Sequence, residues 1–374
     1  MKIRVLLSLI FLSFLFVSRT SYAKEITGVC GDNASYSYDD QKGIMTISGS
    51  GRIYQNWSED ITAGIRQLIL EEGITNTGKG TFQDAIHLTD VRLPDSLTEL
   101  SDNSFSGCTS LKSILIPKNV TKKVNSAFSG SSIEEAVFAE GSRVVACQLF
   151  SNCKTLKKVT LAGTIQTIRA SSFSGCSNLS VIRLPDQLQE IHYDAFRDCV
   201  SLTEITIPGS LKNGGTNCFA GSGLEKITWE EGITDIPSEI FSGCTKLHEI
   251  DLPDSVKSIG YAAFSGCESL TIRKFPSQLT EIGNHAFYNC RRMIYSELPS
   301  TLTRIGDYAF FGTGIAEITL KSHITSIGYY AFNRNTVIRG EDETQAETYV
   351  KKFGNPYVPV RRSMKNVRIA DIPN

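Results

Sequence analysis

Phenylalanine recurs along this chain at a nearly constant interval, and that interval restricts the fold more than any other feature of the sequence. Twelve of the 19 phenylalanines stand 22 or 23 residues apart: Phe82, Phe105, Phe128, Phe150, Phe173, Phe196, Phe219, Phe241, Phe264, Phe287, Phe310 and Phe332. One unit of this length cannot bury its own apolar face, whereas stacked units share a continuous core. The period therefore predicts a single solenoid of about 12 repeats, each 22–23 residues long.

Each repeat contains two short extended segments and no run long enough for a helix. In residues 202–207, aliphatic and polar side chains alternate, which is typical of a half-buried strand, and Pro208 ends the segment. A second apolar pair, such as Leu279 and Ile282, precedes the next register phenylalanine. The expected fold class is a β-rich solenoid with a small N-terminal β cap and a short C-terminal closing segment.

The two ends differ from the repeats. Tyr36 and Tyr38 alternate with serine before a Lys42-Gly43 turn and an apolar segment at residues 44–47, which predicts a hairpin. In residues 346–353, four apolar side chains fall on one helical face. A solenoid needs polar outer surfaces at both ends. We therefore expect an N-terminal cap over residues 24–62, repeats over 63–340, and a C-terminal cap and tail over 341–374.

The first 23 residues have the pattern of a secretory signal peptide. Lys2 and Arg4 precede an apolar run over residues 5–17, and Ser21-Tyr22-Ala23 matches a cleavage site. This run is shorter than the roughly 20 residues that cross a bilayer. The sequence thus predicts a secreted or extracellular cell-surface protein without a transmembrane segment in its mature chain.

The repeat motif also resembles a known family. The pattern Phe-x-x-Cys-x-x-Leu-x-x-Ile-x-Leu/Ile-Pro, clearest at residues 196–208 and 241–253, is similar to the BspA-like (Treponema-type) leucine-rich repeats of secreted and surface proteins. The similarity covers roughly residues 65–340. It implies a leucine-rich-repeat solenoid and adhesion to host proteins or other cells.

Cysteine positions argue against a disulfide framework, although the chain has ten cysteines. In-register side chains on stacked coils point the same way at a spacing of roughly 4.8 Å, whereas a disulfide needs converging Cβ atoms about 3.8 Å apart. We expect a column of buried thiols; a Cys147–Cys153 bond is an open alternative, and Cys30 has no evident partner. The column cysteines each lie three residues after a register phenylalanine: Cys108, Cys153, Cys176, Cys199, Cys244, Cys267 and Cys290.

Motifs for catalysis, metals and nucleic acid are missing from the sequence. It contains no Gly-x-Ser-x-Gly, His-Glu-x-x-His or Cys-x-x-Cys pattern, so neither an enzyme nor a metal or other cofactor is expected. A net charge of −1 provides no general attraction for nucleic acid. Glycines recur at one repeat position, which predicts a turn with unusual backbone angles; they are Gly260, Gly283, Gly306 and Gly328.

Candidate binding residues lie on the predicted strand face. Most outward side chains there are mixed polar residues, such as Lys112, Lys157, Lys158, Thr203, Glu204, Glu225, Lys226 and Glu249. Two repeats place Arg273 and Ser296 where an aliphatic residue is expected, and local violations of a consistent pattern often mark function. The other explanation is a harmless local shift. The candidate partner-binding residues are Arg273, Lys274, Arg291, Arg292 and Tyr295.

Together these features predict a non-catalytic binding protein whose partner is a protein or glycan at a cell surface or in extracellular matrix. Adhesion to protein is the first hypothesis. Capture of extracellular polysaccharide is the alternative, which a row of exposed aromatic side chains would favour; the strand face offers chiefly Trp229 and Tyr295, and Trp229 is expected in the core. A self-associating surface-layer component is the third.

Overall fold

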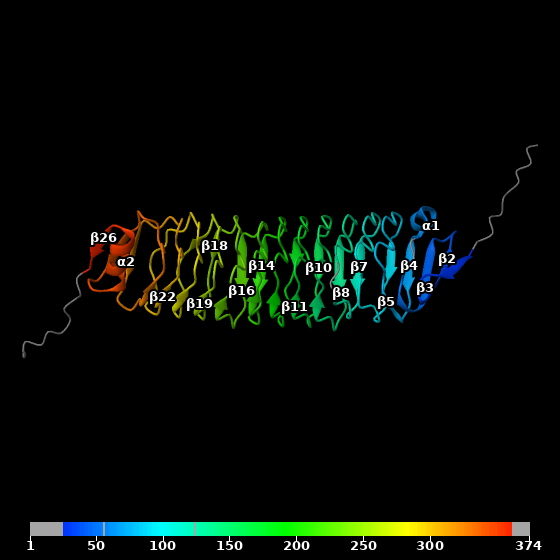
Figure 1. Cartoon of the computed structure of the whole chain (residues 1–374), viewed down its shortest axis with the longest axis horizontal. Helices are drawn as coiled ribbons and strands as arrows, with labels where there is room; N and C mark the ends of the chain where they lie inside the picture. Colours follow the sequence, from blue (N-terminus) through cyan, green and yellow to red (C-terminus); the bar gives the residue numbers. More distant parts are fainter. Residues whose placement is uncertain (1–24, 55–56, 123–124, 361–374) are drawn as a thin grey trace, which may run out of the picture.

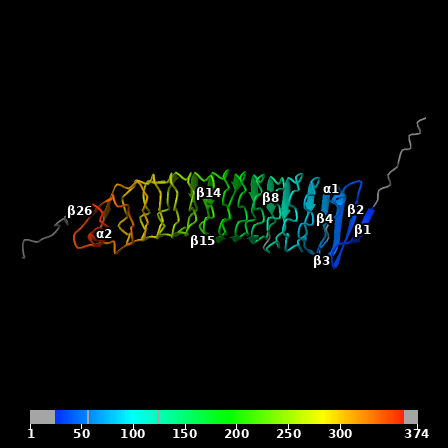
Figure 2. The same cartoon turned by 45° about the horizontal axis from the view of Figure 1, so that its top comes forward.

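The protein is an elongated stack of coils whose two ends lie at opposite extremes of the molecule (Figure 1). The computed structural model describes residues 25–54, 57–122 and 125–360. The predicted signal peptide lies outside the described residues. Turning the molecule by 45° shows the same single row of coils, with no second row beside it (Figure 2). The expected β-rich solenoid is confirmed.

The N-terminal end is a β cap joined directly to the first coil. β2 and β3 form the predicted hairpin, and β1 pairs antiparallel with β2. β3 then pairs in parallel with β4, so the cap and the solenoid share one sheet. A short helix, α1 (Glu59–Gly64), was not predicted. The strands of this region are β1 (Glu25–Val29), β2 (Asn33–Asp39), β3 (Ile44–Arg52), β4 (Gln67–Leu70), β5 (Ile74–Asn76) and β6 (Asp90–Arg92).

The first extended segment of each repeat forms a ladder of parallel strands along the stack. Residues 22 or 23 apart are paired, as in Ile205 with Ile227 and Lys158 with Glu135. β4 and β6 begin this ladder within the N-terminal sheet, and beyond β6 the ladder is divided into three sheets. They contain β7 (Ser113–Ile116), β8 (Glu135–Phe138), β10 (Lys158–Thr160) and β12 (Val181–Ile182); β14 (Glu204–Ile207), β16 (Lys226–Trp229), β18 (Glu249–Ile250) and β20 (Thr271–Ile272); and β23 (Glu317–Leu320), β25 (Val337–Gly340) and β26 (Tyr357–Pro359).

The second extended segment forms another parallel ladder from two-residue strands. Its first sheet contains β9 (Val144–Val145), β11 (Thr167–Ile168), β13 (Glu190–Ile191) and β15 (Asn213–Gly214). Its second contains β17 (Asp235–Ile236), β19 (Ser258–Ile259), β21 (Glu281–Ile282), β22 (Arg304–Ile305) and β24 (Ser326–Ile327).

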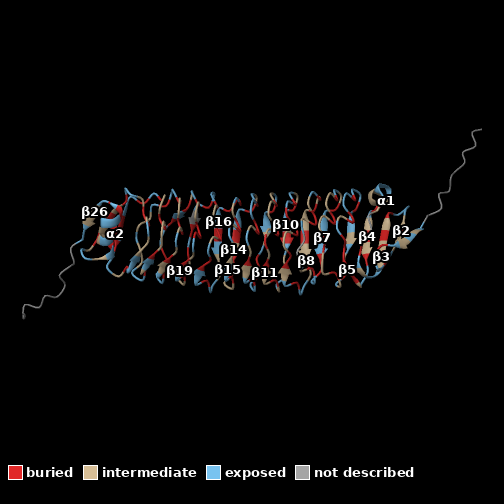
Figure 3. Cartoon of the chain, in the orientation of Figure 1, coloured by how far each residue is buried: buried red, intermediate tan, exposed pale blue. Residues whose placement is uncertain are grey.

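The twelve register phenylalanines form one column inside the stack. Each is at most 1% exposed, and neighbouring ring centroids lie 5.1 to 5.9 Å apart in nearly parallel planes. Buried and exposed residues both occur along the coils from one end of the stack to the other (Figure 3). Stacked rings and aliphatic side chains therefore make the continuous core that the period predicts.

The recurring glycines have a different role from the one that the sequence suggested. Gly260, Gly283, Gly306 and Gly328 do not have left-handed backbone angles. A Cβ atom on Gly283 would instead lie 2.8 Å from the carbonyl carbon of Gly260 in the preceding coil. Close approach of coils excludes a side chain there, so the prediction of an unusual turn at these positions was wrong.

Left-handed backbone angles occur two residues before the register phenylalanine. Residues of very different type adopt them, including Ala262 (φ 49°), His285 (φ 57°) and Tyr308 (φ 54°). No residue preference marks this position in the sequence, because the stacked neighbours impose the conformation on whatever residue is present.

A short helix closes the C-terminal end, as predicted. α2 (Gln345–Phe353) buries Ala346, Tyr349, Val350 and Phe353 on one face, and Gly354 ends it with a φ of 76°. The Tyr349 hydroxyl accepts a hydrogen bond from the main-chain N–H of Phe332, 3.1 Å away. The helix thus covers the last ring of the phenylalanine column.

Candidate functional site

The long-strand ladder presents a polar surface to solvent. Charges of opposite sign alternate across neighbouring coils, with Lys158 Nζ 2.7 Å from Glu135 and Lys157 Nζ 2.6 Å from Glu134. Of the eight side chains that we expected on this face, that of Glu249 lies outside the described side chains, and the other seven are exposed: Lys112, Lys157, Lys158, Thr203, Glu204, Glu225 and Lys226. We define this surface by those seven residues and call it the strand face.

The ladder is interrupted in the region where the repeat pattern is violated. β20 pairs with β18 on one side, and the next strand of the ladder, β23, begins 45 residues later at Glu317. The intervening coil, residues 291–299, contains no strand. Ile294 in this coil is 74% exposed, which is high for a large aliphatic side chain. The interruption thus leaves an apolar side chain in solvent.

A local shift explains Arg273 and Lys274. Ile272 pairs with Ile250, 22 residues earlier, so Ile272 rather than Arg273 fills the buried aliphatic position. Arg273 and Lys274 lie exposed after it, and Phe275 re-enters the core. The Lys274 ammonium is 3.3 Å from a carboxylate oxygen of Asp254.

Arg291 and Arg292 lie exposed at the start of the next coil. The Arg291 guanidinium lies 3.6 Å from the Glu268 carboxylate, and the main-chain N–H of Arg292 donates to the Glu268 carbonyl. In the described part of the chain, no carboxylate lies within ion-pair distance of the Arg292 side chain. The two basic pairs are on adjacent coils, as expected, but Lys274 and Arg291 already have acidic partners.

Tyr295 lies half-buried against the core. Its ring centroid is 6.0 Å from that of Phe275. Burial raises the pKa of its hydroxyl, and the nearby Glu297 carboxylate raises it further. Trp229 is also half-buried, with its ring perpendicular to Phe241 at 5.9 Å. Neither ring forms an exposed stacking platform on the strand face.

The cysteines form a column of free thiols. Each of the seven column cysteines donates a hydrogen bond to the main-chain carbonyl of the register phenylalanine in the preceding coil, at 3.1 to 3.3 Å. All ten cysteines are unbonded, so the Cys147–Cys153 alternative is not realised. Burial raises the pKa of Cys108, Cys153 and Cys244 to about 12. A thiol that stays protonated at neutral pH is a poor nucleophile or metal ligand.

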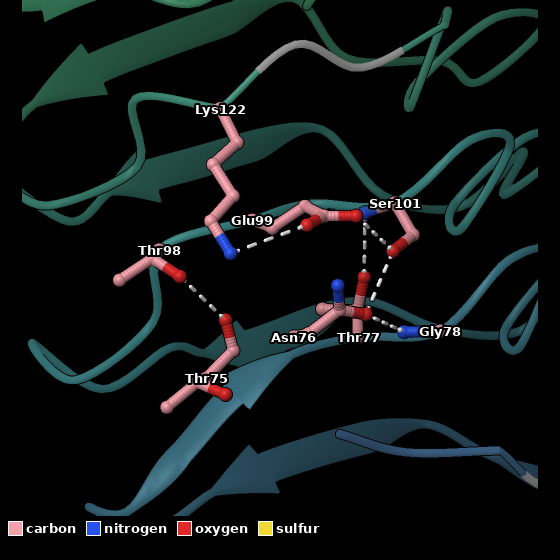
Figure 4. Close-up of polar contacts among 8 residues, drawn as sticks. All are labelled: Thr75, Asn76, Thr77, Gly78, Thr98, Glu99, Ser101 and Lys122. Atoms are coloured by element: carbon pink, nitrogen blue, oxygen red, sulfur yellow. Dashed lines mark hydrogen bonds and ion pairs between the residues drawn. The ribbon is translucent and has the colours of Figure 1, made fainter. Parts of the chain in front are cut away.

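A polar network near the N-terminal end is structural. Asn76 Oδ1 accepts hydrogen bonds from the Gly78 N–H and the Ser101 hydroxyl, both at 2.7 Å, and Thr77 Oγ1 accepts one from the Ser101 N–H (Figure 4). Glu99 lies between this network and Lys122, 3.7 Å from the lysine ammonium. These contacts satisfy buried polar groups in coils that precede the short-strand ladder.

An aromatic cluster on the last coils was missed by the sequence analysis. His285 stacks on Tyr308 with centroids 5.1 Å apart, and Tyr288 stacks on Phe311 at 5.9 Å. Tyr330 lies 5.8 Å from Tyr308. The sequence does contain a pattern that indicates this cluster. The positions two residues before and one residue after the register phenylalanine are aromatic only in these coils.

Within the described ranges, no three His, Cys, Asp or Glu side chains are grouped so that they would hold a metal ion. No helix in the described part of the chain combines the length and the apolar character required to span a bilayer.

Comparison with known proteins identifies the repeats. Three overlapping segments, residues 60–157, 143–236 and 214–339, match the model of the BspA type leucine rich repeat region, which contains six copies of the repeat. No curated protein matches the sequence.

Solved structures of leucine-rich repeat proteins are similar to this chain. A leucine-rich repeat protein from Bacteroides ovatus is 23% identical, with a TM-score of 0.60 over 88% of this chain and 99% of its own. One from Eubacterium ventriosum is 19% identical, with a TM-score of 0.42 over 78% and 96% of the two chains. A leucine rich cell surface protein from Faecalibacterium prausnitzii is 23% identical, with a TM-score of 0.29 over 74% and 96%. Only the first superposition supports the fold.

Proposed function

The chain belongs to the BspA-type leucine-rich repeat family, and from this premise we propose that it is a non-catalytic binding protein of the cell exterior. Its partner is a protein on host tissue or on other cells, held along the long-strand ladder. Solenoids bind partners along such extended surfaces. The predicted signal peptide and the family support an extracellular location.

The observation that carries this proposal is the interruption of the ladder between β20 and β23. Ile294 is exposed there and follows the exposed Arg291 and Arg292 closely in the chain, so this coil offers both an apolar side chain and charged ones. Protein interfaces commonly have a small apolar centre and a polar rim. The alternating charges of the strand face continue along the stack and supply further polar contacts.

Binding to intact cells tests the proposal. The labelled protein should attach to cells, and protease treatment of the cells should reduce attachment far more than glycosidase treatment does. The reverse pattern would indicate a glycan partner. Attachment of the protein only to itself, seen as concentration-dependent growth in sedimentation, would indicate a surface-layer component.

A matched pair of variants locates the contact. Ile294→Asp places a charge at the interruption, and we expect it to reduce attachment about tenfold or more, because buried apolar anchors dominate binding. Val29→Asp is the control, since Val29 is also 74% exposed but lies in the N-terminal cap. Equal attachment by both variants would exclude the interruption as the contact.

A further inference from the structure

The aromatic cluster on the last coils surrounds a hollow of about 520 Å³. Tyr308, Phe311 and Tyr330 supply the rings, and Asn333, Arg334 and Asn335 supply the polar part of the lining. These residues lie on the turns beside the register phenylalanines rather than on the strand face. The hollow is therefore separate from the protein contact proposed above, and the inference does not depend on that proposal.

The rings present half-buried faces rather than forming a filled core. Tyr308 and Phe311 are 5.7 Å apart and nearly perpendicular, at 72°. Tyr330 lies tilted at 38° to Tyr308. Each of the three is only partly covered by the protein. Ring faces at different angles around a hollow can contact a flat ligand on more than one side.

The polar side chains of the hollow differ in what they already bind. Asn333 is committed to the protein, because its Oδ1 accepts from the Gly312 N–H at 2.6 Å and its Nδ2 donates to the Thr313 carbonyl at 2.7 Å. Arg334 and Asn335 are exposed, and their side chains have no hydrogen-bond or ion-pair partner among the described residues. They are therefore available to a ligand.

The charge of the hollow indicates the sign of that ligand. Arg334 carries a positive charge, and no carboxylate lines the hollow. A second cation, the Lys352 ammonium, lies 5.8 Å from the ring of Tyr329 at the edge of the same aromatic cluster. Guanidinium groups bind carboxylates through two parallel hydrogen bonds. An anionic group beside a flat, partly apolar ring system would complement this arrangement.

We propose that the hollow of Tyr308, Phe311, Tyr330, Arg334 and Asn335 binds a carboxylate-bearing sugar of an extracellular glycan. The sugar ring lies against the aromatic faces, its carboxylate pairs with Arg334, and Asn335 hydrogen-bonds its hydroxyl groups. A purely apolar ligand would leave Arg334 unpaired, and a neutral sugar would not use its charge.

Two matched pairs of probes test the proposal by titration calorimetry with the purified protein. Sialyllactose is compared with lactose, and trigalacturonate with galactotriose; the members of each pair differ in whether they carry a carboxylate. We expect at least one acidic sugar to bind about tenfold or more tightly than its neutral counterpart. The pair that shows the preference distinguishes a sialic acid from a uronic acid as the source of the carboxylate.

Variants separate the ring contact from the charge contact. Tyr308→Ala should weaken binding of the acidic sugar about tenfold, and Arg334→Gln should remove the preference for the acidic sugar, whereas Arg334→Lys should keep part of it. Tyr193→Ala and Arg143→Gln serve as controls, since both residues are exposed and lie outside the hollow. Circular dichroism establishes that each variant is folded.

Four outcomes would overturn the proposal. They are equal affinity for acidic and neutral sugars, no binding of either acidic sugar, an unchanged preference in Arg334→Gln, and an equal loss of binding in the control variants. Binding of decaproline in place of the sugars, competing at the same rings, would assign the hollow to a proline-rich peptide instead. None of these results bears on attachment to protein, which the Ile294→Asp variant tests separately.

Discussion

The thiol of Cys176 donates a hydrogen bond to the main-chain carbonyl of Phe150, 3.1 Å away in the preceding coil. The same contact recurs at the other six column cysteines, so each thiol joins two successive coils beside the phenylalanine column. Sulfur is a weak donor, but the carbonyl is buried and would otherwise lack this partner. The column of cysteines thus stabilises the stack through hydrogen bonds and not through disulfides.

Removal of one ring from the middle of the phenylalanine column should destabilise the folded protein. Phe173 is fully buried between the rings of Phe150 and Phe196, so Phe173→Ala should lower the free energy of unfolding by about 3–5 kcal/mol. Urea denaturation followed by circular dichroism measures the change. Tyr193→Ala, at a 56% exposed ring, is the control and should cost far less. Similar losses in the two variants would contradict the buried column.

The thiols should be free but protected in the folded protein. None of the ten cysteines forms a disulfide. Eight of them, including the seven in the column, are fully buried. A thiol reagent at pH 8 should therefore react slowly with these eight thiols in the folded protein. In urea without reductant, the same reagent should react with all ten thiols. A count near zero in urea would show that the cysteines are paired.

Stability should decline in alkaline solution. Burial raises the pKa of Cys153 from 9.0 to about 12 in the folded protein, so the unfolded chain loses its thiol proton first as pH rises. The contribution of this thiol is fully present below pH 9 and is lost between pH 9 and pH 12. Each such thiol should lower the free energy of unfolding by about 1 kcal/mol between pH 8 and pH 10.

The matched measurement uses Cys153→Ala. Tyrosine and lysine side chains also titrate in this range, and they remain in the variant. The alkaline loss of stability should therefore be smaller in Cys153→Ala than in the original protein, by about the contribution of one thiol. An identical pH dependence in both proteins would rule out the buried thiol as a cause.

Glycine substitutions should distinguish close coil contact from free space. A Cβ on Gly283 would meet the Gly260 backbone at 2.8 Å, so Gly283→Ala should destabilise the fold by about 1–3 kcal/mol. Gly163 has nothing within 4 Å of its added Cβ, and Gly163→Ala should leave stability unchanged or slightly increased. Thermal unfolding of the two variants provides the comparison, and the opposite order would contradict the close contact.

Reversal of charge at the interruption should affect the partner and not the fold. Arg291→Glu with Arg292→Glu removes two exposed positive charges, and Arg291 loses only a surface ion pair with Glu268. We expect an unchanged thermal midpoint, weaker attachment to the protein partner, and a salt dependence of attachment that is smaller than in the original protein. If the double variant binds the protein partner with unchanged affinity at low salt, Ile294 and the strand face become the better candidates for the partner contact.

The structure confirms what followed from the repeat in the sequence. The buried phenylalanine column, the two strands of most coils, the N-terminal hairpin and the helical face of Ala346, Tyr349, Val350 and Phe353 were all predicted. These features depend on which residues are apolar and how far apart they are, and stacking is the way in which such short units bury them together.

Other features depend on neighbours one coil away, and only the tertiary structure decided them. Only glycine fits at position 283, because the backbone of Gly260 lies too close for a side chain. The charge of Arg291 is partly neutralised, because the Glu268 carboxylate lies beside it. The hollow at Tyr308 arises from turns of successive coils that are distant in sequence. The sequence by itself determined that the coils stack and which side chains fill their interior. Side-chain direction and the packing of adjacent coils determined which surface residues meet, because these relations come into being only when the coils are in contact.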